Sequence, residues 1–214
     1  MPPPSTTKPP PSYREAERHL ARRDRRLRKL IRRIGKCTLT PHDDYFSVLV
    51  HTIVSQQISS KAALSILGRL AVAARSKKFR PSRLDALDDA GMRACGISTG
   101  KLKSLRDLCA KVRDGTLPLR QLAKFEDGEL RERLTAVHGI GPWSADMFLM
   151  FSLGRPDILP VGDLGLRAGV QEVYELKMLP TPKELVEMAE PWRPYRSIAT
   201  WYFWRSRGPV PQSK

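Results

Sequence analysis

Cysteine is scarce, and the few cysteines are not arranged as metal ligands or as a disulfide framework. Cys37, Cys95 and Cys109 are the only three among 214 residues, and no two of them form a CxxC pair. An odd, widely spaced set argues against a disulfide scaffold, and the missing pairs argue against an iron–sulfur cluster or a cysteine-rich zinc site. The four histidines are scattered without an HxxxH pair. We therefore expect no cofactor.

Long apolar runs are also missing. The longest run is far shorter than the roughly 18 residues that a membrane-spanning helix needs. The N-terminal stretch MPPPSTTKPPP has no apolar segment like the core of a secretory signal. These absences predict a soluble intracellular protein with no membrane partner, in the cytoplasm or nucleoid if bacterial and in the nucleus if eukaryotic.

Acidic residues are few beside basic ones. There are 22 Asp and Glu against 38 Lys and Arg, which gives a net charge of +16. Such an excess is typical of proteins that bind a polyanion, either nucleic acid or an acidic membrane surface. Residues 1–36 contain 12 basic and 3 acidic side chains and so carry +9, while the rest of the chain carries +7. Part of the charge is therefore a local basic segment, and part belongs to the folded body.

Stretches of alternating β-branched residues are absent, so we predict an all-α fold. Residues 1–12 are rich in proline and are expected to form a disordered tail. Residues 13–34 have a helical pattern in which an arginine-rich face lies opposite an apolar stripe. That face is either simply solvated or contacts phosphates without reading sequence. The apolar stripe consists of Leu20, Leu27, Leu30, Ile31 and Ile34.

Further helices are predicted between turn-forming glycines and prolines. Their approximate ranges are 43–56, 59–75, 85–90, 100–114, 127–136, 142–153, 164–175, 182–190 and 194–206.

The most specific motif is the run His-Gly-Ile-Gly-Pro at residues 138–142. Gly139 and Gly141 tolerate positive φ and leave the backbone amides uncovered, while Ile140 can point into the core as a plug. Pro142 suits the first turn of the following helix. The result is a tight hairpin whose N–H groups lie at a helix N-terminus, a geometry that binds an anion such as a DNA phosphate. An ordinary helical hairpin with a glycine turn is the alternative interpretation.

With its flanks, this motif resembles the helix–hairpin–helix DNA glycosylase superfamily, and within it the AlkA-like 3-methyladenine DNA glycosylases. The resemblance covers roughly residues 43–206. It implies two helical subdomains with a DNA-binding cleft: a central lobe of about 45–155, and a second lobe from about 13–44 plus 156–206. The segments that carry it are LVHTIVSQQIS (49–59), MRACGIS (92–98), HGIGPWSADMFLMFSLGRPDILPVGDLGLRAGV (138–170) and PWRPYRSIATWYFW (191–204).

Asp163 precedes a predicted helix, where an aspartate is a good N-cap. The resemblance makes it the catalytic carboxylate as well, because it follows Trp143 by the family spacing of 20 residues. Cleavage of a glycosidic bond develops oxocarbenium character on the sugar, which a carboxylate beside C1′ stabilises in a dry pocket. The carboxylate can also orient or deprotonate the attacking water. Alkylated purines such as 3-methyladenine already carry positive charge, so little acid catalysis is required.

Trp143 stands where bifunctional members of the superfamily carry a lysine. That lysine follows the hairpin glycines and attacks C1′ to form a Schiff base. The resemblance therefore implies hydrolysis without strand cleavage. The iron–sulfur loop of the endonuclease III-like members is also absent from this sequence.

The resemblance places Trp143, Met147 and Trp204 around the flipped base, where electron-rich rings stack on an electron-poor purine. Met147 replaces a tyrosine found in some AlkA-like members. Aromatic residues at helical spacing are more often core, which is the interpretation for Trp201 and Phe203.

Flipping leaves a hole in the base stack, and by alignment Gln57 is the wedge that fills it. The alternative is that Gln56 and Gln57 cap or bridge two helices, and Ser59 can cap the helix that follows. Main-chain carbonyls of Val137 and Ile140 could hold a structural Na⁺ or K⁺ that bridges to a phosphate. The other expected DNA contacts are His138, Gly139, Ile140, Gly141 and Ser144.

We predict a monomeric, monofunctional glycosylase of the DNA-3-methyladenine glycosylase II type. It would release alkylated purines, such as 3-methyladenine and 7-methylguanine, from double-stranded DNA in base excision repair. One alternative is a glycosylase for deaminated or mismatched bases. Another is a non-catalytic helix–hairpin–helix DNA-binding protein, against which Asp163 argues, since a binder needs no carboxylate facing a phosphate-rich strand.

Overall fold

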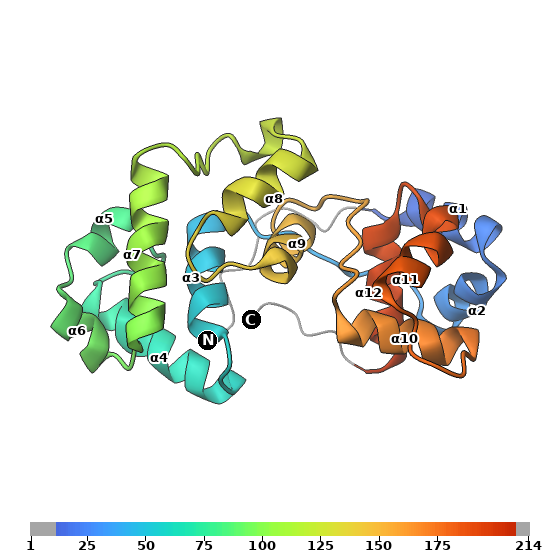
Figure 1. The fold of residues 1–214 in the computed structure, drawn as a ribbon, viewed down its shortest axis with the longest axis horizontal. Coiled ribbons are helices and arrows are strands. Elements are labelled where there is room, and N and C mark those ends of the chain that lie inside the picture. Colours follow the sequence, from blue (N-terminus) through green and yellow to red (C-terminus); the bar gives the residue numbers. More distant parts are fainter. Residues whose placement is uncertain (1–11, 209–214) are drawn as a thin grey trace. The chain divides into compact units, whose positions relative to one another are not determined.

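The computed structural model describes residues 12–208, and all regular secondary structure in this range is helical (Figure 1). The absence of any strand within these residues confirms the all-α prediction. Within the same range no helix is long and apolar enough to cross a membrane. The predicted tail, residues 1–12, lies outside the described residues except for Ser12. The helices are α1 (Arg14–Arg23), α2 (Arg25–Ile34), α3 (Tyr45–Ser55), α4 (Ser60–Ala73), α5 (Pro81–Asp85), α6 (Asp89–Ala94), α7 (Thr99–Arg113), the 3-10 helix η1 (Leu122–Lys124), α8 (Asp127–Thr135), α9 (Pro142–Phe151), α10 (Leu164–Tyr174), α11 (Pro182–Met188), the 3-10 helix η2 (Glu190–Trp192) and α12 (Arg196–Ser206).

The described chain divides into two compact units. The first unit, residues 42–148, contains α3 to α8 and most of α9. The second unit joins the residues up to Pro41 with those from Leu149 onward, and contains α1, α2 and α10 to α12. The second unit is thus built from both ends of the chain.

The first unit has its core along α3 and α7. Asp44 caps α3 by accepting the Ser47 amide, and the Ser47 hydroxyl accepts the Phe79 amide at 2.9 Å, which ties the next loop to the helix. Ser59 caps α4 through the Ala62 amide, as the sequence predicts. The core side chains on α3 and α7 include Phe46, Leu49, Val50, Ile53, Leu105 and Leu108.

The predicted helix over 85–90 is wrong, because two short helices flank that stretch instead. Pro81 begins α5, and proline suits a first helical position since its missing N–H has no partner there anyway. Asp88 then caps α6 by accepting the Gly91 amide at 2.8 Å. A strong cap in the middle of the predicted range therefore starts a new helix.

The single helix predicted over 13–34 is also wrong, since the chain breaks at Asp24 between α1 and α2. Asp24 is extended, with φ −138° and ψ 115°, and its Oδ1 accepts the amides of Arg26 and Leu27. Its Oδ2 accepts the Tyr174 hydroxyl and, at 3.1 Å, the indole N–H of Trp192, which is fully buried. The carboxylate caps α2 and also accepts a hydrogen bond from a buried indole. Together these bonds stabilise the fold more than an unbroken helix through Asp24 would.

The second unit packs around α12, whose Trp201, Tyr202 and Phe203 are buried. This confirms the core interpretation of Trp201 and Phe203. Helix α10 lies beside α12 (Figure 1), and the approach is closest at Gly169, where a Cβ would come within 2.6 Å of the Phe203 carbonyl oxygen. Glycine is therefore required at this crossing.

Candidate active site

The glycine-rich hairpin lies in the first unit, between α8 and α9. Helix α9 begins at Pro142, as predicted, and Ile140 is only 4% exposed, which confirms its role as a buried plug. Gly139 has φ +80°, a conformation that costs other residues backbone strain. The sequence therefore builds the tight turn for the reason that the motif predicts.

Side chains of helix α7 contact the backbone and the histidine of the hairpin. A Cβ on Gly139 would lie 2.5 Å from the Ser104 hydroxyl oxygen, and that oxygen is 3.0 Å from Nδ1 of His138. The amide of His138 donates to Oδ2 of Asp107 at 2.7 Å. Burial acts to raise the pKa of Asp107, but hydrogen bonds from Lys111 and from this amide hold it below its usual value. These contacts fix the backbone of the hairpin.

Two hairpin amides face no partner within the described residues. These are the N–H groups of Gly139 and Gly141, at the N-terminus of α9, where backbone amides and the helix dipole favour an anion. The His138 amide is occupied by Asp107, and Ser144 is only 7% exposed. The predicted phosphate contact is therefore supported best at the two glycines.

An ion pair between a buried carboxylate and a half-buried guanidinium joins the helices on either side of the hairpin. Asp146 on α9 is 8% exposed and accepts from Arg131 on α8, with N–O distances of 2.7 and 2.9 Å. Burial raises the pKa of Asp146, and the guanidinium opposes that shift. Removing Arg131 would leave the Asp146 carboxylate buried and uncompensated.

The turn after α3 is bonded to the hairpin. Gln56 donates through Nε2 to the Gly139 carbonyl at 2.8 Å, and Lys101 on α7 donates to the Val54 carbonyl at 2.7 Å. Gln57, the next residue after Gln56, is exposed and has φ +58°. A left-handed non-glycine residue is uncommon and often marks a functional position. Gln56 therefore bridges, while Gln57 is left projecting from the surface.

Trp143 and Met147 lie four residues apart on α9 and so share one face of that helix. Trp143 is 52% exposed, unusually high for a tryptophan, and Met147 is half-buried. An exposed indole beside a thioether offers a flat surface on which a base could stack. Their assignment to the base pocket stays a prediction.

Asp163 lies in the second unit and caps α10, as predicted. Its Oδ1 accepts the Leu166 amide at 2.6 Å. The same oxygen accepts the indole N–H of Trp204 on α12 at 2.8 Å. Two donors from different helices therefore fix the plane of this carboxylate, which is half-buried.

Trp204, predicted to stack on the base, has further contacts in this unit. Its ring stacks on Phe151 with centroids 5.8 Å apart and planes 12° apart. A Cβ on Gly165 would lie 3.1 Å from Oδ1 of Asp163 and 3.4 Å from the Trp204 ring. Glycine at this position leaves the indole room to reach the carboxylate. The predicted stacking on a base stays a prediction.

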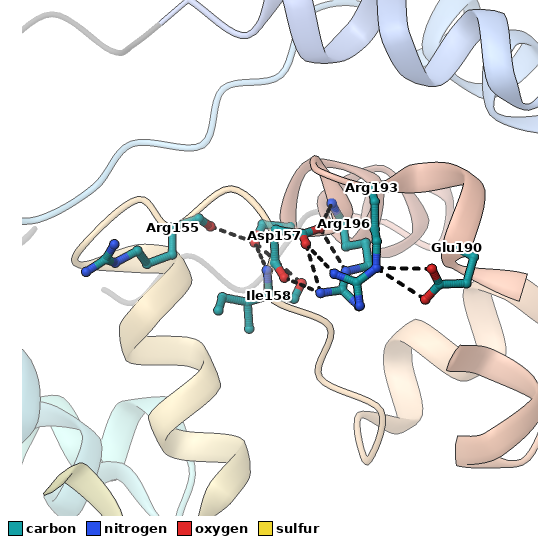
Figure 2. A network of polar contacts seen from close by, with 7 residues as sticks. Arg155, Asp157, Ile158, Glu190, Arg193 and Arg196 are labelled. Atoms are coloured by element: carbon teal, nitrogen blue, oxygen red, sulfur yellow. Dashed lines mark hydrogen bonds and ion pairs between the residues drawn. The ribbon is translucent and has the colours of Figure 1, made fainter. Parts of the chain in front are cut away.

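A polar network fixes the chain that leads to Asp163 (Figure 2). The Asp157 carboxylate accepts from Arg193 at 2.8 Å and from Arg196 at 2.8 and 2.9 Å. The buried Ser197 hydroxyl donates to the Arg155 carbonyl and accepts the Ile158 amide. The loop before Asp163 is thus held to the start of α12, the helix that carries Trp204.

Trp204→Phe is expected to lower kcat about tenfold with little change in KM. Phenylalanine keeps a ring against Phe151 but loses the N–H, and a hydrogen bond to a charged group contributes about 1.5–3 kcal/mol. The control is Phe151→Leu, which removes the stacking partner and keeps the N–H. Steady-state kcat and KM on alkylated duplex would distinguish them, and a wild-type kcat for Trp204→Phe would show that the indole does not position the carboxylate.

Sequence reasoning missed the residues that support this geometry. Ser104, Asp107 and Gly165 act through contacts with residues distant in the chain or through the space that they leave. No local pattern signals such roles. The alternative in which Gln56 bridges two elements comes nearest, because Gln56 does bridge the turn to the hairpin.

The first unit thus has a glycine-rich hairpin with two open amides, and the second unit has a carboxylate fixed by two donors. A family model described as HhH-GPD superfamily base excision DNA repair protein matches residues 50–194. The chain belongs to this superfamily, which confirms the resemblance seen in its motifs.

Relatives and solved structures extend the match over nearly the whole chain. DNA-3-methyladenine glycosylase 1 of Schizosaccharomyces pombe is 33% identical over 91% of this chain and 88% of its own length. The crystal structure of a DNA-3-methyladenine glycosidase from Bacillus halodurans matches with TM-score 0.86 and 36% identity, over 92% of this chain and 91% of that one. The S. pombe 3-methyladenine DNA glycosylase in complex with abasic DNA matches with TM-score 0.79 and 31% identity, over 92% and 98%.

Proposed function

We propose that this chain is a monofunctional DNA glycosylase of the DNA-3-methyladenine glycosylase II type. It would flip alkylated purines out of double-stranded DNA, bind them as a monomer and hydrolyse the N-glycosidic bond. The observation that carries the proposal is the Asp163 carboxylate, held by two donors on one oxygen. The names of the relatives, and abasic DNA in one solved neighbour, support an alkylated base as substrate.

The chemistry needs one well-placed negative charge. As the base departs, positive charge develops at C1′ and O4′ of the sugar, and the Asp163 carboxylate stabilises it. The same group orients or deprotonates the water that attacks C1′. A 3-methyladenine or 7-methylguanine base is a cation before cleavage and leaves as a neutral purine. The leaving group therefore needs little help from an acid.

The other predicted residues would bind and flip the nucleotide. The Gly139 and Gly141 amides would hold a backbone phosphate. Gln57, exposed and in a left-handed conformation, would fill the gap in the base stack. The neighbouring Gln56 would support it through its hydrogen bond to the Gly139 carbonyl of the hairpin. Trp143 would contribute an aromatic face for the base, together with Met147 and Trp204.

A structural Na⁺ or K⁺ at the hairpin fits the groups present. The Val137 carbonyl accepts the Ile140 amide at 3.0 Å and retains a second lone pair, and the Ile140 carbonyl has no donor within the described residues. We propose that these two carbonyls would hold the ion, which would supply positive charge next to the phosphate. Among the described residues, no His, Cys, Asp and Glu group is suited to a transition metal.

Base release without strand cleavage is the expected activity on alkylated duplex DNA. The purified chain is incubated with methylated, end-labelled duplex, and the released bases are separated by chromatography. We expect 3-methyladenine and 7-methylguanine in solution and strands that break only after alkali, because Trp143 stands where a lyase has its lysine. Strand breaks before alkali, or an adduct trapped with borohydride, would contradict the monofunctional assignment. Duplexes with deaminated or mismatched bases test the alternative substrates that Met147 leaves open.

A further inference from the structure

The N-terminal helices α1 and α2 expose a dense set of basic side chains. Eleven Lys and Arg residues lie within 14–36, and all of them are exposed. On α2 every residue is either cationic or apolar, and at about 100° per residue the cationic ones fall within an arc of about 160°. We call this set the basic face. Its members are Arg14, Arg18, Arg22, Arg23, Arg25, Arg26, Arg28, Lys29, Arg32, Arg33 and Lys36.

No member of the basic face forms an ion pair with any residue in 12–208. Elsewhere in the protein, arginines such as Arg106, Arg131 and Arg196 are paired with carboxylates. The basic face is therefore distinguished by its density of cations, none of which is paired with a carboxylate in that range.

The acidic residues of these helices do not neutralise the basic face, because they bond elsewhere. Oε1 of Glu17 accepts the Cys37 amide at 2.7 Å and the Tyr202 hydroxyl at 2.9 Å. Glu15 faces the Tyr195 hydroxyl, and burial together with this carboxylate raises the pKa of Tyr195. Asp24 caps α2 and accepts a buried indole. These carboxylates face the interior of the second unit and leave the cations of the basic face without a carboxylate partner.

This arrangement is unfavourable for the folded chain alone. Neighbours at i,i+3 and i,i+4 on α2, such as Arg25 with Lys29 and Lys29 with Arg32, repel one another. Arg25 and Arg26 also lie in the first turn, where the helix dipole disfavours cations. A surface of this kind is stabilised by a polyanion that replaces the missing carboxylates.

We propose that the basic face is a second DNA-binding surface, which contacts the phosphates of double-stranded DNA without reading sequence. It belongs to the second unit, whereas the hairpin amides belong to the first, so the enzyme would hold DNA from both units. The proposal rests on the proposed function, which makes DNA the polyanion at hand. Its physical signature is counterion release, which makes affinity depend steeply on salt.

The test replaces three side chains at the centre of the face, Arg25→Gln, Lys29→Gln and Arg32→Gln, in the full chain. None of these three side chains forms a hydrogen bond, ion pair or cation–π contact within the described residues, whereas Arg28 bonds to a carbonyl and Arg26 lies over the Tyr174 ring. Truncation would be a poorer test, because it removes Asp24 and the buried Leu20 and Leu27. Glutamine keeps good helix propensity.

We expect binding to an undamaged duplex to weaken at least about tenfold near 0.1 M salt, and the slope of log K against log salt to fall by about 2–3. The thermal midpoint should stay the same or rise, because repulsion is relieved. The kcat at saturating alkylated DNA should stay within about twofold, since Asp163 and the hairpin are untouched. A merely structural role would lower the midpoint instead.

The matched control removes three exposed cations outside the basic face, Lys124→Gln, Lys177→Gln and Lys183→Gln, none of which forms an ion pair within residues 12–208. An equal loss of slope in both variants would reduce the effect to overall charge and overturn the proposal. An unchanged slope of log K against log salt in the basic-face variant would also overturn the proposal. So would a basic-face variant that no longer binds phosphatidylserine vesicles but binds duplex DNA like the wild type. Failure of the wild-type chain to release alkylated bases would instead overturn the proposed function.

Discussion

Asp163→Asn is expected to abolish base release, with a loss of at least about 10²–10³-fold, the range found when one preorganised stabilising group is removed. Asparagine keeps the shape and can still accept the Leu166 amide as an N-cap, so the fold should survive. The lost property is the negative charge beside the sugar. Binding to alkylated or abasic duplex should be unchanged or tighter, because a charge that repels phosphates is gone.

The measurement is release of 3-methyladenine under single-turnover conditions, with a thermal melt and a binding titration on the same preparation. Asp88→Asn is the matched control, since Asp88 also caps a helix, through the Gly91 amide, and is exposed. It should keep wild-type activity. Excision by Asp163→Asn at the wild-type rate would end the catalytic assignment.

Gly139→Ala is expected to cause the largest loss of DNA binding among substitutions in the hairpin. At φ +80° an alanine is strained by about 1–3 kcal/mol. Its Cβ would also lie 2.5 Å from the Ser104 hydroxyl oxygen, so α7 or the hairpin must shift. We expect a clearly lower thermal midpoint and at least about tenfold weaker binding, because the shifted amides no longer converge on one phosphate.

Gly141→Ala is the matched control for stability. Gly141 has no positive φ, and a Cβ there would meet no described atom within 4 Å. Its thermal midpoint should stay near that of the wild type. Combining Gly139→Ala with Ser104→Ala separates the two costs, since the second change removes the hydroxyl and leaves the backbone strain. Equal midpoints for the two glycine variants would show that the turn does not require its left-handed residue.

The hairpin and the catalytic candidate could be predicted because their signals are local. Two glycines around an isoleucine, followed by proline, dictate a turn, a plug and a helix start within five residues. Asp163 is readable as a cap from its place before α10, and its catalytic assignment comes from the family pattern. In each case a short stretch of chain contains the atoms that start the turn or cap the helix.

The support around these features could not be predicted, because it depends on pairs far apart in the sequence. Gln56 reaches the Gly139 carbonyl across 83 residues, and Trp204 reaches Asp163 across 41. The break at Asp24 was missed for a similar reason. Its cap alone could have been suspected, but the partners that decide the matter, Tyr174 and Trp192, lie 150 and 168 residues further on.

Gly165 and Gly169 are one turn apart on α10, and both face α12. One gives the indole space beside the carboxylate, and the other lets two helix backbones almost touch. The orientation of the Asp163 carboxylate therefore depends on the spacing of α10 and α12. A methyl group added at Gly169, one turn along α10 from Gly165, would push α12 away from α10. The indole N–H of Trp204 would then move away from the Asp163 carboxylate. Variation that tunes the rate of this enzyme can therefore arise at a position that never meets the nucleotide.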